Sequence, residues 1–223
     1  MTRVYLHGAG LSAASWGEVE GIALDLPGHG RRPRTEARAE AFADAIAGDV
    51  PESAVLIGLS LGGMVAMAFA ARYPKRVRAL VLVDMPIRAP SPIISWYTPF
   101  VAPIVTRVPG RRTIGKAVGS RIENPEGQAA FRAHIEAADP SGLADALVVA
   151  ARFDGDAYLP RMKLPLLALV GKRSLLTGAR YRAKLRAACP QVDIVELDTG
   201  HLIPFDDRAS MEAEIDRFLA GLG

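Results

Sequence analysis

A short glycine-rich turn with a central serine constrains this chain more than any other feature. Residues 58–63 read Gly-Leu-Ser-Leu-Gly-Gly, which contains the pattern G-x-S-x-G with Ser60 at its centre. The apolar run at 54–57 is typical of a buried strand, and the run at 64–71 is typical of a buried helix. Glycines are needed where a strand and a helix nearly touch, and the sharp turn lifts the serine hydroxyl clear of the sheet. The segment therefore predicts a nucleophile elbow with Ser60 as the nucleophile.

Composition narrows the class of protein. The chain has 223 residues, 50% of them hydrophobic, and a formal net charge of +3, which fits one domain with or without an inserted piece. No apolar run reaches the ~20 residues of a membrane-spanning helix, and basic runs interleaved with aromatic residues, typical of nucleic-acid binders, are missing. The single cysteine, Cys189, leaves no pair for a disulfide or a cysteine-based metal cluster. We therefore expect a cytoplasmic protein without metal, nucleic-acid or membrane partners, whose first strand begins too early for a signal peptide.

Strand-like and helix-like segments alternate along most of the chain. This alternation is typical of an α/β fold with a mainly parallel sheet. Apolar runs predict strands at Arg3–Leu6, 21–24, 54–57, Val77–Val83, 164–170 and Val192–Leu197, and helical patterns predict helices at 35–50, 64–71, 178–188 and 207–222. The elbow therefore lies within a series of strand–helix units.

The alternation fails between residues 86 and 160. This stretch is rich in proline first and helical later, and its prolines are expected to break any long regular element. We interpret residues 86–160 as an insertion that lies over the sheet, whereas residues 1–85 and 161–223 form the core.

A nucleophilic serine needs a base, an acid that orients the base, and donors for the oxyanion. His201 directly follows the last strand, so it lies at the carboxyl edge of the sheet together with the elbow, and we expect it to be the base. The backbone N–H groups of Leu61, next to the nucleophile, and of Ala9, after the first strand, are the expected oxyanion donors. His7 and His29 are interpreted as residues that shape loops.

Four motifs occur in a characteristic order: His-Gly-Ala-Gly at 7–10, Asp-Leu-Pro-Gly-His-Gly at 25–30, the elbow at 58–63, and Gly-His at 200–201. With this order and spacing the chain resembles the α/β-hydrolase superfamily, and it is similar to the small esterase, lactonase and haloperoxidase-like members. The resemblance covers essentially the whole chain and implies that the insertion is a helical cap. The antiparallel hairpin that usually leads the family sheet has no counterpart here. We therefore expect a trimmed, mainly parallel sheet of about six strands flanked by helices.

The acid of the triad is where the chain departs from the family pattern. The family usually places an Asp, in a Gly-x-x-Asp setting, after the strand at 164–170, and this chain has Ser174 there. One interpretation is that Asp84 supplies the carboxylate from the end of Val77–Val83, because adjacent parallel strands lie only ~5 Å apart. An Asp at this position is also common in the family as a cap hinge. A second interpretation is a dyad of Ser60 and His201, oriented by Ser174 or by water, and a third is chemistry other than hydrolysis.

The substrate pocket is predicted from the large apolar residues near the motifs. The candidates are Leu11 and Trp16 on the oxyanion loop and Trp96, Tyr97, Phe100 and Phe131 in the cap. A pocket lined in this way favours an apolar or aromatic acyl or alcohol group, although aromatic residues of a cap also pack its own core. The middle of the cap is basic, which suits an acidic substrate or a carrier protein, and equally a solvated helix face.

Together these features predict a serine hydrolase that cleaves a small ester, lactone or thioester through an acyl-enzyme. The expected catalytic residues are Ser60, His201 and Asp84, the substrate is a small molecule, and no metal or organic cofactor is needed. Two alternatives remain open. One is a cofactor-free lyase or cyclase on the same scaffold, and the other is a ligand-binding protein with a degraded triad.

Overall fold

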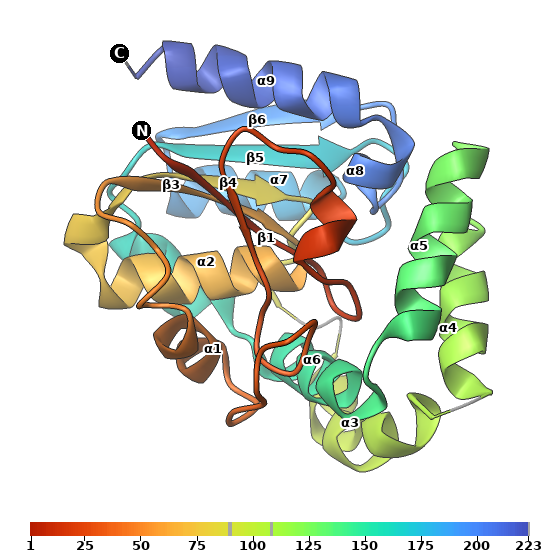
Figure 1. Ribbon diagram of the computed structural model, residues 1–223. Helices are drawn as coiled ribbons and strands as arrows, with labels where there is room; N and C mark the ends of the chain where they lie inside the picture. Colours follow the sequence, from red (N-terminus) through yellow and green to blue (C-terminus); the bar gives the residue numbers. More distant parts are fainter. Residues whose placement is uncertain (89–90, 108, 223) are drawn as a thin grey trace.

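Six parallel strands form one sheet through the middle of the molecule (Figure 1). The computed structural model describes residues 1–88, 91–107 and 109–222. The strands lie side by side in the order β2-β1-β3-β4-β5-β6, and every neighbouring pair is parallel. Their bounds are β1 (Arg3–Leu6), β2 (Ile22–Leu24), β3 (Ala54–Leu59), β4 (Val77–Val83), β5 (Leu166–Gly171) and β6 (Val192–Leu197). The predicted α/β class with a mainly parallel sheet is confirmed.

The central strands β3 and β4 are covered on both faces. Every residue of β3 is buried, and in β4 only Arg78 is exposed, which is why these strands read as continuous apolar runs. Helices α1 (Ala39–Ala45), α2 (Leu61–Arg72) and α7 (Ala179–Ala188) cover one face, and α9 (Arg208–Ala220) covers the other (Figure 1). Because all strands run in one direction, the loops that follow them meet at one edge of the sheet.

One predicted helix is much shorter than expected. α1 spans only Ala39–Ala45, whereas the prediction covered 35–50. A turn follows the helix, with Asp49 N–H donating to the Ile46 carbonyl (3.0 Å), and Gly48 within this turn is a poor helix former. The other predicted strands and helices are observed with small shifts at their ends.

In the described residues, four α-helices lie between β4 and β5, beside and below the carboxyl edge of the sheet (Figure 1). They are α3 (Pro92–Val105), α4 (Gly110–Gly119), α5 (Pro125–Ala137) and α6 (Pro140–Arg152). α3 runs through Pro99 and Pro103, so the expectation that the prolines break every long element is wrong here. Water can hydrate the carbonyl groups that lose their N–H partner, because most of α3 is exposed. The division into core and cap at residues 86 and 160 stays a prediction. No helix of the described residues is long and apolar enough to cross a bilayer.

Candidate active site

Ser60 lies on a strained turn between β3 and α2. Its backbone has φ 50° and ψ −110°, in the left-handed half of conformational space that non-glycine residues avoid. The turn is held by the Ser60 N–H, which donates to the Val83 carbonyl at 3.0 Å. A Cβ on Gly62 would lie 2.1 Å from the Leu6 carbonyl oxygen, and one on Gly58 would lie 2.4 Å from the backbone of Gly62. The close approach predicted from the sequence is therefore observed, and it leaves no room for side chains at these two glycines.

His201 and Asp84 meet across the carboxyl edge of the sheet. Asp84 follows β4 with φ 41° and is fully buried, and His201 lies after β6, with 24% of its side chain exposed. The Nδ1 atom of His201 is 2.7 Å from Oδ2 of Asp84. This contact fixes the ring and leaves Nε2 available for another partner.

The Asp84 carboxylate also receives hydrogen bonds from the end of β5 and from the loop that follows it. Ser174 Oγ donates to Oδ2 at 2.6 Å, Thr177 Oγ1 donates to Oδ1 at 2.5 Å, and the Gly171 N–H donates to Oδ1 at 2.9 Å. Ser174, which occupies the usual position of the family acid, thus holds the carboxylate that comes from the neighbouring strand. Burial and this negative charge raise the pKa of the Tyr181 hydroxyl, so this neighbouring phenol stays neutral. Nothing in the sequence singled out Thr177.

Two buried histidines brace the loops after β1 and β2 against each other. His7 Nε2 accepts the N–H of Leu26 at 3.0 Å, so the proton is on Nδ1, which donates to the Gly8 carbonyl at 2.8 Å. His29 Nε2 accepts the N–H of Gly10 at 3.2 Å, and its Nδ1 donates to a carbonyl of its own loop. Burial lowers the pKa of both imidazoles, that of His7 to about 3. Both rings are therefore neutral and shape loops, as the sequence predicts.

The two backbone N–H groups that the sequence predicts as oxyanion donors have no acceptor among the described residues. One belongs to Leu61, the first residue of α2, and the other to Ala9, in the loop held by the histidine brace. The next two N–H groups of that loop are occupied, by His29 and by the Gly8 carbonyl. The Ser60 hydroxyl likewise makes no hydrogen bond within the described part of the chain. Free backbone N–H groups of this kind are what the binding of an oxyanion would require.

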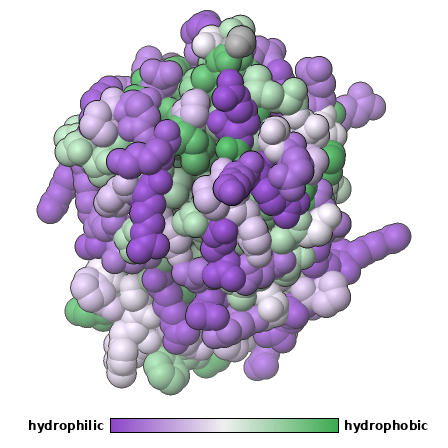
Figure 2. Space-filling view, turned by 90° about the vertical axis from the view of Figure 1, so that its left-hand side faces the viewer, coloured by the Kyte–Doolittle hydropathy of each residue, from purple (hydrophilic) through white to green (hydrophobic). Residues whose placement is uncertain are grey.

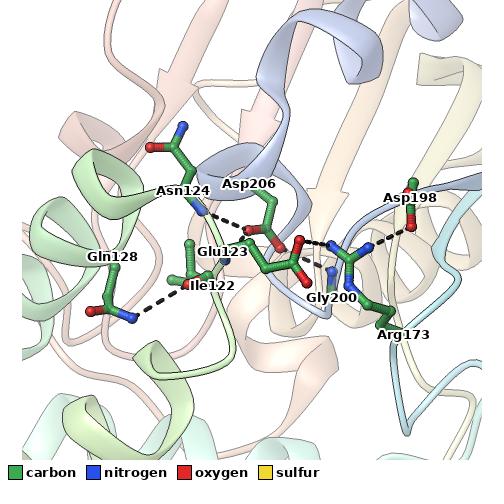
Figure 3. A network of polar contacts seen from close by, with 8 residues as sticks. All are labelled: Ile122, Glu123, Asn124, Gln128, Arg173, Asp198, Gly200 and Asp206. Carbon is green, nitrogen blue, oxygen red and sulfur yellow. Dashed lines mark hydrogen bonds and ion pairs between the residues drawn. The ribbon is translucent and has the colours of Figure 1, made fainter.

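The loop that carries His201 is tied to the link between α4 and α5 (Figure 3). One oxygen of Asp206 accepts the Gly200 N–H at 2.9 Å, and the other accepts the N–H of Glu123, in the link between α4 and α5, at 2.7 Å. Arg173 contacts Glu123 at 3.0 Å and Asp198 at 2.5 Å. Asp207 caps α9, whereas Asp206 joins the two sides of the site.

The predicted pocket residues do not gather around one cavity. Leu11 lines a cavity of about 510 Å³, together with Gly10, Ser12, His29, Gly30, His134, Ala137, Ala138, Asp139 and Pro140. Trp16 packs on Tyr5 in the sheet core, with ring centroids 5.2 Å apart, and Phe131 packs on Phe205 at 5.6 Å. The prediction that Trp16 and Phe131 line the pocket is therefore corrected: both pack in the core, where a large ring makes more contacts than in a pocket wall.

The other three predicted pocket residues lie on α3. Trp96, Tyr97 and Phe100 are exposed by 65%, 53% and 65%, respectively. They do not line the cavity that Leu11 lines. The expectation that they line a pocket is therefore corrected: they lie on the outer face of α3, because only small residues of this helix pack inward.

Comparisons with known proteins agree with this geometry. Residues 4–214 match the alpha/beta hydrolase family, and the chain belongs to this family. A pimeloyl-[acyl-carrier protein] methyl ester esterase from Aromatoleum aromaticum is 28% identical over 91% of this chain and 91% of its own. The structure of a thermophilic esterase from Thermogutta terrifontis has a TM-score of 0.87 at 30% identity, over 100% of this chain and 90% of its own.

More distant structures share the fold. The enol-lactonase from Burkholderia xenovorans has a TM-score of 0.84 at 21% identity, over 98% of this chain and 90% of its own. MenH from S. aureus has a TM-score of 0.84 at 20% identity, over 100% of this chain and 94% of its own. The chain is thus a hydrolase of the α/β-hydrolase family, and its relatives in sequence support the cleavage of an ester bond.

Proposed function

We propose that the protein is a serine esterase in which Ser60, His201 and Asp84 form the catalytic triad. The observation that carries the proposal is the 2.7 Å contact between His201 Nδ1 and the buried Asp84 carboxylate, at the edge of the sheet where the strained Ser60 lies. A charged orienting group of this kind is what a catalytic histidine needs in order to accept a proton from serine. The contact therefore argues against both the dyad and the degraded triad.

The reaction follows from the atoms that the site leaves unoccupied. His201 Nε2 takes the proton of the Ser60 hydroxyl as Oγ attacks the ester carbonyl, and the Leu61 and Ala9 N–H groups bind the oxyanion. The resulting imidazolium gives its proton to the leaving alcohol, which departs as the acyl-enzyme forms. Water then attacks the acyl group with His201 as base again, and the acid and free Ser60 are released.

Asp84 performs its role through the charge that it keeps beside His201. The hydrogen bonds from Ser174, Thr177 and Gly171 hold the carboxylate in place. In this proposal the acid is Asp84 at the end of β4, and Ser174, at the position after β5 where the family usually has its acid, donates a hydrogen bond to it.

Carboxylic methyl esters are the first substrates to test. Relatives at 28% identity are named methyl ester esterases, although this level of identity leaves the acyl group open. We propose a small ester substrate and assign no cofactor.

Labelling with a small organophosphonate tests the nucleophile. We expect intact-mass spectrometry to show one rapid addition to the wild type and none to Ser60→Ala. The matched control is Ser120→Ala, an exposed serine at the end of α4, which must label like the wild type. Labelling of folded Ser60→Ala at the wild-type rate, or turnover of a methyl ester by this variant, would remove Ser60 from the mechanism.

A further inference from the structure

α3 presents a continuous apolar stripe to the outside of the molecule. We define the α3 face as Ile93, Trp96, Tyr97, Phe100 and Ile104, which recur every three or four residues and so share one side of the helix. Each is more than half exposed, up to 68% for Ile93 and Ile104. Most of the exposed large apolar side chains in the described residues lie on this one helix. Contiguous apolar patches of this kind mark interaction sites.

The remainder of the cap leaves this face uncovered. The opposite side of α3 packs on α6, where Ala102 is buried beside Ala144 and Val148 and Ser95 Oγ donates to the Ala151 carbonyl. The stripe therefore points away from the core. By contrast, Figure 2 shows the face on the left of Figure 1, where hydrophilic side chains predominate and hydrophobic ones are interspersed.

The sequence on both sides of α3 is basic. Between residues 88 and 122 the sequence has no Asp or Glu, and its charged residues are Arg88, Arg107, Arg111, Arg112, Lys116 and Arg121. α3 itself carries no charge. Arg107, Lys116 and Arg121 are exposed, and no ion pair in the described residues involves them. The apolar stripe is thus followed along the chain by exposed cations that form no ion pair in the described residues.

We propose that the α3 face docks on the surface of an anionic lipid bilayer. Tryptophan, tyrosine and phenylalanine on one side of a short helix are suited to the boundary between headgroups and acyl chains, and nearby Arg and Lys side chains bind anionic headgroups. Such a helix lies in the interface without crossing it, which is consistent with the absence of a membrane-spanning helix in the described residues. This revises the sequence-based expectation of no membrane partner, and it does not depend on the proposed esterase activity.

The same features disfavour two other occupants. A second copy of the chain docked through this face in a two-fold dimer would bring the two basic segments together, and like charges at an interface are costly. An acidic protein would satisfy the cations, but it would also have to cover an uncharged stripe of three aromatic side chains. A lipid surface satisfies the charges and the apolar side chains together.

Vesicle binding tests the proposal with the whole protein. We expect it to sediment with phosphatidylcholine vesicles that contain phosphatidylglycerol, and much less with phosphatidylcholine alone. Trp96 supplies a second readout, because the other tryptophan, Trp16, is only 1% exposed. A blue shift of the emission on addition of anionic vesicles would therefore report Trp96 entering an apolar environment.

Two double variants and one control make the test specific. Trp96→Ser/Phe100→Ser should weaken the binding by ~tenfold or more, and Arg107→Gln/Lys116→Gln should remove most of the preference for anionic vesicles. Ile22→Ser, an exposed apolar residue on the edge strand β2, should bind like the wild type. Absence of binding to anionic vesicles, or equal binding by Trp96→Ser/Phe100→Ser, would overturn the proposal. A wild-type dimer that this variant converts to a monomer, without vesicle binding, would show that the occupant is a second copy.

Discussion

The core side of the molecule, which carries the candidate site, and the predicted cap side, which carries α3, are built in different ways. On the core side, Asp84 is fully buried with four hydrogen-bond partners, and His7 and His29 each use both ring nitrogens. On the cap side, α3 carries a stripe of large apolar side chains, and each of them is more than half exposed. On the core side, hydrogen bonds hold the groups that catalysis needs in accurate positions. The α3 face provides an exposed apolar surface and holds no such group. The two regions should therefore respond differently to substitution.

The largest expected effect is on the core side, at Asp84. Asp84→Asn keeps the shape of the side chain but removes the charge that stabilises the imidazolium, so we expect kcat to fall by ~10⁴-fold, as for an orienting Asp elsewhere. Ester hydrolysis at saturating substrate measures the change. Asp193→Asn, an exposed residue of β6, is the matched control and should change kcat by less than ~twofold. A loss of that same small size at position 84 would return Asp84 to the role of a cap hinge.

The same position allows a sharper test by transferring the acid. Ser174 Oγ lies 2.6 Å from the oxygen of Asp84 that contacts His201, so a carboxylate at position 174 would reach the same region. In Asp84→Asn/Ser174→Asp we expect at least ~tenfold of the lost activity to return. Circular dichroism and thermal unfolding would verify the fold. If the folded double variant is no more active than Asp84→Asn, the carboxylate must come from the end of β4.

The next effect concerns stability and the buried His7. Its pKa is about 3 in the folded protein and near 6.5 in an unfolded chain, so the unfolded state binds more protons between these values. Folding stability should therefore fall as the pH is lowered from about 6.5 toward 3, by up to ~1.4 kcal/mol per pH unit for this one group. His7→Gln keeps an acceptor for the Leu26 N–H but does not titrate. Urea unfolding at pH 7.5 and 5.0 should show a smaller loss for the variant, and equal losses would contradict the neutral, buried imidazole.

A smaller effect is expected when one support of the acid is removed. Ser174→Ala deletes one of four hydrogen bonds to Asp84 and leaves the charge in place. We expect kcat to fall by ~10- to ~100-fold, since one hydrogen bond to a charged group contributes about 1.5–3 kcal/mol and every 1.4 kcal/mol is about tenfold. A loss as large as that of Asp84→Asn would mean that Ser174 itself contacts the reacting groups.

The same contrast between core and cap explains what the sequence could predict. The strands, the elbow and the loop histidines could be predicted from short sequence patterns. Continuous apolar runs indicate buried strands, and residues that follow parallel strands lie at one edge of the sheet. Asp84 was predicted as the acid while a dyad and other chemistry stayed open, since its contact with His201 joins residues 117 positions apart. The places of Trp16, Phe131 and Trp96 were wrong, because an aromatic side chain suits a core, a pocket wall or an outer face equally well, and only the packing of the helices decides.

The smallest effect on catalysis is expected on the cap side, at the α3 face. Trp96→Ser/Phe100→Ser removes two exposed rings that bury little area against the core, so hydrolysis of a small soluble ester and the free energy of unfolding should change by less than ~twofold and ~0.5 kcal/mol, respectively. Steady-state kinetics without vesicles and urea unfolding measure both. Unchanged kinetics together with lost vesicle binding would show that catalysis does not depend on the α3 face and that vesicle binding does. A large loss of activity would place α3 over the reacting groups and return Trp96 and Phe100 to the substrate pocket that the sequence predicted.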